Sequence, residues 1–186
     1  MVKRKPTNKY YFSVEGETEQ WYLKWLQELI NNTEEAVCKV SIDCPVRKNP
    51  LKHVKSLTVT RRIEIYHFFD YESDEDIHAK GFQEALDNMK KAEKIGKQIK
   101  YRSGYSNFTF DLWIILHMTN CNASFSHRKQ YIGPINRALG EKFQNMDEFK
   151  EEENFKRCLK KMDLSNVIAA VERAKKIMQR NQENGY

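Results

Sequence analysis

Two short apolar runs, each ending on an acidic residue ahead of a polar turn and a helix, constrain the fold of this chain most strongly. The first run, residues 10–14, is aromatic or β-branched except for Ser13, and Glu15 and Gly16 follow it. The second run, residues 63–70, ends on Asp70. Runs of this length and type predict buried strands. Because such strands alternate with helices of about 10–20 residues, the pattern favours parallel βαβ units.

The same reasoning along the chain predicts an α/β fold with about four strands in a mainly parallel sheet, flanked by helices and followed by a helical extension. The expected strands are 10–14, 36–46, 63–70 and 98–102. The expected helices are 17–31, 50–58, 74–95, 106–118, 127–139, 147–161 and 164–180. We therefore expect an α/β domain over residues 1–120 and a helical C-terminal extension over residues 121–186 that packs on the same domain.

Composition narrows the class of protein. The net charge of +6 favours an anionic partner such as nucleic acid. The four cysteines and five histidines are scattered and lack the spacing of a zinc site. No run approaches the roughly 18 apolar residues of a membrane span, and residues 1–6 lead into a strand rather than into a signal-peptide core. A cytoplasmic protein without membrane contact is the expectation.

The two strand ends offer three carboxylates to one site. Parallel strands point their carboxyl ends to the same edge of a sheet, so Glu15, Asp70 and Glu72 are expected to converge there. Asp70 and Glu72 flank one residue and project to one side, because side chains alternate along a strand. Oxygen ligands without His or Cys select Mg²⁺ or Mn²⁺ rather than zinc. The alternative interpretation is that these acids only cap helices or pair with lysines.

The order of these elements resembles the Toprim domain of topoisomerases, primases and certain nucleases. Within that group the chain is similar to the RloB-like branch, also called AbiLii-like, of bacterial defence loci. The matching motifs are Val14-Glu15-Gly16-Glu17-Thr18-Glu19 with Tyr22, Asn49-Pro50 with Val54, Phe69-Asp70-Tyr71-Glu72, Ser106-Asn107, Phe110-Asp111-Leu112-Trp113 and Leu116-His117. The likeness covers roughly residues 9–120. The chain departs from the usual pattern at Phe108, where proline is typical, at Asp111, where glutamate is typical, and at Glu72, where many Toprim domains carry aspartate.

The resemblance implies metal-dependent phosphodiester chemistry by a nuclease that acts on DNA or RNA. Asp70 and Glu72 would hold Mg²⁺ or Mn²⁺, and Glu15 would be a further ligand or the general acid/base. Lys100 and Arg102, expected to leave the fourth strand toward the same edge, are the predicted contacts to phosphate.

The resemblance also concerns the start of the helix expected over residues 106–118 and the biological role of the protein. Ser106 and Asn107 are expected to cap the helix predicted over residues 106–118, and Ser106, Asn107 and Asp111 are expected to support the metal ligands from outside the metal's own shell. The family implies an abortive-infection effector in antiviral defence, controlled by a partner ATPase, and a homodimer is left open. A non-catalytic module that binds nucleic acid or protein is the alternative. A nucleotidyl-transfer or topoisomerase domain is less favoured, because the chain has no strand-passage or zinc module.

Overall fold

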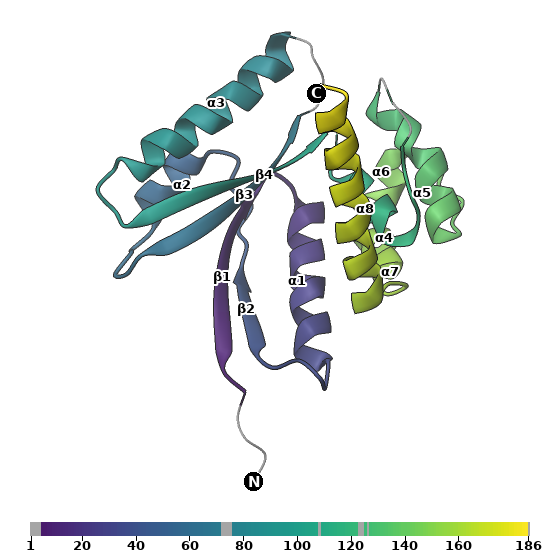
Figure 1. The fold of residues 1–186 in the computed structure, drawn as a ribbon, viewed down its shortest axis with the longest axis horizontal. Helices are drawn as coiled ribbons and strands as arrows, with labels where there is room; N and C mark the ends of the chain where they lie inside the picture. Colours follow the sequence, from purple (N-terminus) through teal and green to yellow (C-terminus); the bar gives the residue numbers. More distant parts are fainter. Residues whose placement is uncertain (1–4, 72–75, 108, 123–124, 126, 186) are drawn as a thin grey trace. The chain divides into compact units, whose positions relative to one another are not determined.

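Four parallel strands in the spatial order β2-β1-β3-β4 form the sheet, counted over the residues that the structure describes. This computed structural model describes residues 5–71, 76–107, 109–122, 125 and 127–185. The strands are β1 (Thr7–Val14), β2 (Lys39–Asp43), β3 (Ile63–Tyr71) and β4 (Ile99–Asn107) (Figure 1). Because β1 lies between β2 and β3, the strand that precedes Glu15 and the strand that carries Asp70 are neighbours. The predicted fold class is confirmed.

Two strands differ from their predicted bounds for reasons of backbone pairing. β1 begins at Thr7 rather than at residue 10, because Thr7 pairs with Lys39 at the start of β2. β2 covers only part of the predicted range 36–46. Val46 nevertheless forms an isolated parallel bridge with Val14, so the chain beyond β2 stays beside the end of β1.

The fourth strand is longer than predicted and packs closely on its neighbour. It continues past residue 102 to Asn107. A Cβ atom placed on Gly104 would lie 2.9 Å from the ring of Phe68 in β3. Glycine at this position therefore leaves room for the aromatic ring of the adjacent strand.

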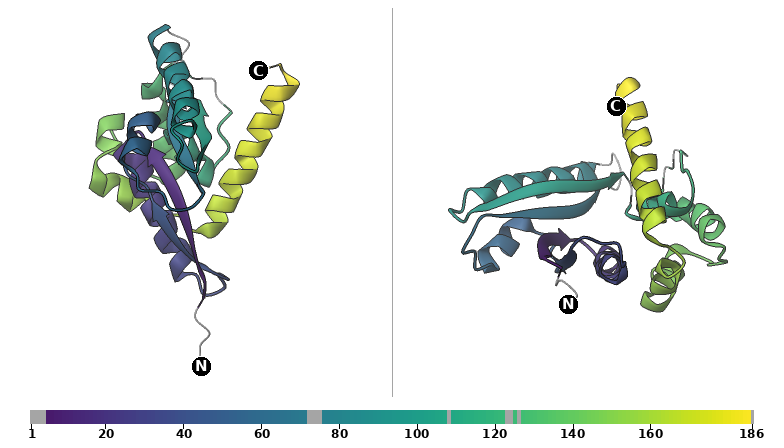
Figure 2. Two further views of the ribbon diagram at one scale, coloured as in Figure 1. Left: turned by 90° about the vertical axis from the view of Figure 1, so that its left-hand side faces the viewer. Right: turned by 60° about the horizontal axis from the view of Figure 1, so that its bottom comes forward.

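Helices cover both faces of the sheet. α1 (Glu17–Asn32) packs against β1 and β2, while α2 (Pro50–Ser56) packs against α3 (Asp76–Glu93). α3 also contacts β3 and runs along it (Figures 1 and 2). Right-handed crossovers from strand to strand place α1 on one face and α2 and α3 on the other.

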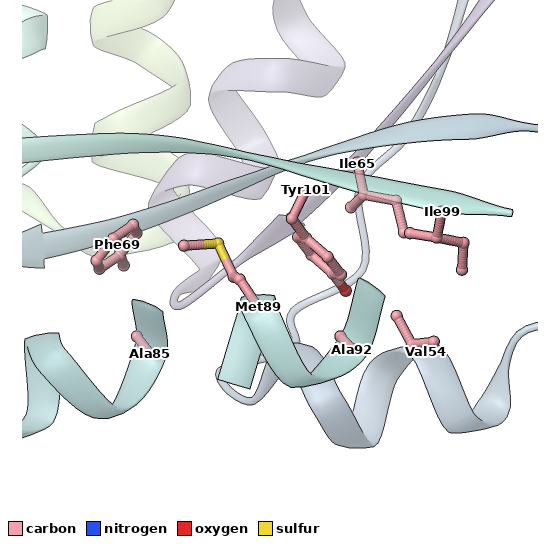
Figure 3. Packing of buried hydrophobic residues seen from close by; sticks show 8 residues of the cluster. All are labelled: Val54, Ile65, Phe69, Ala85, Met89, Ala92, Ile99 and Tyr101. Carbon is pink, nitrogen blue, oxygen red and sulfur yellow. The ribbon is translucent and has the colours of Figure 1, made fainter. Parts of the chain in front are cut away.

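An apolar cluster lies between β3, β4 and the two helices α2 and α3 (Figure 3). Alternate residues of each strand point toward the helices, as the period of two requires. The buried members are Val54, Ile65, Phe69, Ala85, Met89, Ala92, Ile99 and Tyr101. This packing fixes the strands whose ends carry the predicted site.

The chain divides into two compact units, Met1–Tyr105 and Ser106–Tyr186. The described helices of the second unit are α4 (Asp111–Met118), the 3₁₀ helix η1 (Arg128–Tyr131), α5 (Ile132–Leu139), α6 (Met146–Phe149), α7 (Glu152–Leu159) and α8 (Leu164–Glu183). α4 contacts α5 and α8. The predicted domains, 1–120 and 121–186, would separate α4 from these partners, and that division stays a prediction.

The start of α4 differs from its prediction. Ser106 and Asn107 are the last residues of β4, and the helix begins only at Asp111. The prediction that the pair caps this helix is wrong, because strand pairing carries the backbone through both residues. The hydroxyl of Thr109 instead donates to Oδ2 of Asp111 at 2.6 Å.

Candidate functional site

The carboxyl ends of β1 and β3 bring Glu15 and Asp70 together. In the parallel pairing of these strands Val14 lies opposite Phe68, which puts Glu15 one residue and Asp70 two residues beyond the last matched pair. Oε2 of Glu15 accepts a long hydrogen bond, 3.5 Å, from the backbone N–H of Asp70. Both acidic side chains are half-buried. Two predicted site residues that are 55 positions apart in the sequence thus share one edge of the sheet.

Glu19 is a further acid at this edge, and it was not among the site residues predicted from the sequence. Glu17 is exposed, whereas Glu19 is only 7% exposed and accepts a hydrogen bond from the Thr18 hydroxyl at 3.2 Å. A Cβ atom on Gly16 would lie 2.8 Å from Oε2 of Glu19. The Glu19 carboxylate therefore lies against the residue that follows Glu15. The sequence signal that could have identified Glu19 was Gly16 next to Glu15, with Glu19 four positions after Glu15.

The loop after β2 brings a cation to the end of β1. The backbone N–H of Arg47 donates to the carbonyl of Val14 at 2.8 Å, and the N–H of Val14 donates to the carbonyl of Pro45 at 3.2 Å. The Arg47 side chain is exposed. Since Val14 immediately precedes Glu15, the basic sequence Arg47-Lys48 lies beside the acidic edge. This position was not predicted from the sequence.

Lys100 and Arg102 do not lie at the edge where the prediction placed them. The N–H of Ile63 donates to the carbonyl of Gln98 at 2.9 Å, which aligns the starts of β3 and β4. Arg102 pairs with Glu64, the second residue of β3, at 3.2 Å. Because β4 runs on to residue 107, both cations belong to its first half, and Glu64 precedes Asp70 by six residues, about 20 Å of extended strand. Their placement at the carboxyl edge is corrected, and contact with nucleic acid stays a prediction.

Glu72, the third predicted ligand, lies outside the described residues. Within those residues, no group of three or more His, Cys, Asp or Glu side chains is arranged to hold a metal ion. Glu15, Glu19 and Asp70 nevertheless offer carboxylate oxygens alone, which is the donor chemistry that Mg²⁺ and Mn²⁺ prefer. The chemistry of these donors suits a hard cation, but Glu15, Glu19 and Asp70 are not arranged as a group of three that would hold one, and the metal site itself stays a prediction.

Ser106, Asn107 and Asp111 belong to the second unit. Asp111 is 1% exposed, and its Oδ2 forms an ion pair with the ammonium group of Lys150 at 2.9 Å. This pair supplies the partner that a buried carboxylate requires. Oδ1 of Asp111 is buried without a hydrogen-bond partner among the described residues. The predicted support of the metal ligands by these three residues stays a prediction.

A buried polar cluster connects the strands behind the acids. Oγ of Ser13, two residues before Glu15, is 2.8 Å from Nδ1 of His67, and both side chains are fully buried. The hydroxyl of Tyr101 donates to the carbonyl of Pro50 at 3.1 Å. Burial lowers the pKa of His67 to about 4 and raises the pKa of Tyr101. His67 is therefore neutral at pH near 7, and since no solvent reaches it, the Ser13–His67 pair holds strands together rather than attacking a substrate.

The comparison with protein families covers nearly the whole chain. Residues 10–186 match the family model described as RloB-like protein, and this range includes both acidic strand ends and the helical unit. The chain belongs to the RloB-like family. The resemblance drawn from the motifs is thereby confirmed for RloB-like proteins. No match was found among curated proteins or among solved structures. In the described parts of this RloB-like chain, every helix is too short or too polar to cross a lipid bilayer.

Proposed function

We propose that this RloB-like protein is a Mg²⁺- or Mn²⁺-dependent nuclease that hydrolyses phosphodiester bonds of DNA or RNA. The observation that carries the proposal is the contact between the Glu15 carboxylate and the backbone of Asp70, at the ends of two neighbouring parallel strands. In open α/β sheets this edge is where ligands bind. Membership of the RloB-like family supports the same proposal, because the motifs that resemble the family include Glu15 and Asp70.

The roles of the residues follow from their positions. Glu15, Asp70 and Glu72 would hold the ion, and the buried Glu19 carboxylate beside Gly16 is available as a further oxygen donor. An ion held by these residues would supply Lewis-acid chemistry toward a phosphodiester, with positive charge for the phosphate oxygens and a lowered pKa for a bound water molecule. The N–H of Asp70 fixes one oxygen of Glu15 and so orients its carboxylate.

Cations on the same side would receive the substrate. The exposed Arg47 side chain follows the backbone that is hydrogen-bonded to the end of β1, which puts a guanidinium group within reach of a phosphate near Glu15. Arginine binds phosphate through two parallel N–H donors. The overall charge of +6 further favours an anionic polymer over a neutral substrate.

We also propose the biological setting that the family resemblance implies. The protein would act in the cytoplasm as an abortive-infection effector against phage, held in check by a partner ATPase. The family resemblance alone supplies this partner, because the 186 residues contain no Walker A sequence that would point to ATP binding.

Metal binding and cleavage test the proposal directly. We expect the purified protein to bind Mn²⁺ saturably in calorimetry. We also expect it to cleave DNA or RNA in the presence of Mg²⁺ or Mn²⁺, and the partner ATPase is added if the protein alone is inactive. Asp70→Asn should abolish cleavage and weaken Mn²⁺ binding. The control Asp87→Asn, which removes an exposed carboxylate on α3 that is 46% accessible, should change neither.

A different result would favour the non-catalytic module. Salt-sensitive binding of nucleic acid that survives loss of Glu15 and Asp70, without saturable Mn²⁺ binding, would show that the basic surface holds nucleic acid without turnover.

A further inference from the structure

Four aromatic rings form a continuous cluster at the carboxyl ends of β3 and β4. Phe69 and Tyr71 come from β3, Phe82 from α3 and Tyr105 from β4. The ring of Phe82 is central: its centroid is 4.9 Å from that of Phe69, 5.0 Å from that of Tyr71 and 5.4 Å from that of Tyr105. Tyr71 and Tyr105 both meet Phe82 edge to face, at interplanar angles of 84° and 82°.

The cluster runs from the core to the surface. Phe69 is 4% exposed and belongs to the apolar core (Figure 3), whereas Tyr105 is 63% exposed. Edge-to-face packing at these distances is favourable for aromatic rings. Tyr105 is therefore an exposed ring supported from below by packed rings. This arrangement differs from a surface tyrosine that stands alone, which needs no explanation.

The cluster begins at the residues that flank Asp70. Phe69 and Tyr71 lie immediately before and after it in β3, and they share one face of the strand because side chains alternate. β4 is the next strand, about 5 Å away in the hydrogen-bonding direction. The exposed ring of Tyr105 and the carboxylates of Glu15 and Asp70 thus belong to the same edge of the sheet.

We propose that Tyr105, supported by Phe82, is a stacking platform for an unpaired nucleobase, and that the substrate class is therefore single-stranded nucleic acid. This inference rests on the proposed function, because it names the substrate of that same edge. A base within a duplex already has both faces covered by its neighbours, whereas an unpaired base exposes a face that an aromatic ring covers. Stacking of this kind tolerates any base sequence. The net positive charge of the protein supplies the attraction to the backbone.

Binding measurements in EDTA, where no cleavage occurs, test the platform. The probes are a fluorescent oligothymidylate of about 12 nucleotides and a duplex of the same length. We expect the wild type to bind the single strand more tightly than the duplex. Tyr105→Leu should weaken binding of the single strand roughly tenfold and leave duplex binding unchanged, while Tyr105→Trp should retain it. The matched control is Tyr10→Leu, which removes a tyrosine that is 41% exposed on β1.

The leucine variant separates stacking from a merely structural role. Leucine still covers Phe82 with apolar atoms but offers no aromatic face. If Tyr105 only shields Phe82 from water, Tyr105→Leu should bind the single strand as tightly as the wild type does. That result would overturn the proposal. Tighter binding of the duplex than of the single strand by the wild type would also overturn it. Thermal melts of each variant show whether the fold is retained, and Tyr105→Phe serves as a second conservative variant that should bind like the wild type.

Cleavage assays on the same proteins keep the two proposals distinguishable. If the protein cleaves nucleic acid with none of the metals tested, but its binding of the single strand depends on Tyr105, the nuclease proposal is contradicted and the stacking proposal is supported. If the protein cleaves duplex as well as single strands, and Tyr105→Leu does so equally, the nuclease proposal stands and the platform fails.

Discussion

The two ends of the parallel sheet carry their charged residues in different ways. At the carboxyl end Glu15 binds the backbone of Asp70, and Glu19 is withdrawn from water against Gly16. At the amino end Arg102 and Glu64 form an ion pair whose side chains are 49% and 40% exposed. A charge that is withdrawn from water costs free energy, whereas an exposed pair costs and contributes little. Among the described acids at these two ends, the one most withdrawn from water, Glu19, lies at the carboxyl end, where the proposed site is.

The largest expected effect comes from matched glutamate changes at the two ends. Glu15→Gln should lower the rate of cleavage at least about 100-fold, because it removes a charged oxygen donor from the site. Glu64→Gln should leave the rate within about twofold. Cleavage of DNA and RNA under saturating Mg²⁺ measures both rates. Equal losses in the two variants would contradict the assignment of function to the carboxyl end.

The buried middle of the sheet, between the two ends, should respond to pH. The pKa of His67 is about 4 in the folded protein, against 6.5 when unfolded, so its contribution to stability is fully present above pH 6.5 and is lost as the pH falls toward 4. Between about pH 6.5 and pH 5 this amounts to about 2 kcal/mol of unfolding free energy. Urea denaturation of the wild type and of His67→Phe measures the difference in slope.

The control for this pH dependence is the exposed His127, since His127→Gln should keep the slope of the wild type. The buried His53 and His117 also have lowered pKa values and should account for the slope that remains in His67→Phe. An unchanged slope in His67→Phe would show that His67 does not stay neutral inside the sheet.

Glycine substitutions sharpen the comparison at the carboxyl end. Gly16→Ala should weaken Mn²⁺ binding about tenfold, because the new Cβ would lie 2.8 Å from Oε2 of Glu19 and push the carboxylate away. Gly81→Ala, on α3, meets no atom within 4 Å and should leave metal binding unchanged. Calorimetric titration with Mn²⁺ measures both affinities. Normal affinity in Gly16→Ala would remove Glu19 from the proposed set of donors.

The smallest effect is expected at the amino end. Arg102→Ala should lower the unfolding free energy by less than about 1 kcal/mol, because its ion pair with Glu64 is exposed. Urea denaturation at low and high salt measures this contribution, and salt should diminish it. A loss of several kcal/mol would mean that the pair at the amino end is structurally as important as the acids at the carboxyl end.

The features of the fold that local pattern determines could be predicted from the sequence. The runs ending at Glu15 and Asp70 predicted two buried strands, and parallel pairing then placed both acids at one edge. The stripe of apolar residues over 164–180 predicted the helix α8, which the structure shows as Leu164–Glu183. In these segments burial and local spacing favour the same structure.

What could not be predicted depends on contacts between distant segments. Glu17 and Glu19 both lie in the first turn of α1, and the turn at Gly16 determines that Glu19 is buried and Glu17 exposed. The ammonium group of Lys97 likewise donates to the carbonyl of Val54 in α2 at 2.8 Å, a contact between residues 43 positions apart. The length of β4, and with it the position of Lys100 and Arg102, was set by pairing with β3 rather than by the half-charged sequence of the strand.

The strand order has a consequence for the newly made chain. β1 is synthesised first but pairs with β3, so the Glu15–Asp70 edge closes only after residue 71 has left the ribosome. Contacts of such long sequence separation form late, since the intervening chain has to be ordered first. A nascent chain that ends within α2 would carry Glu15 without its neighbour. The acidic edge is therefore assembled only when the sheet is complete, so any activity that depends on both Glu15 and Asp70 would be absent from the unfinished chain.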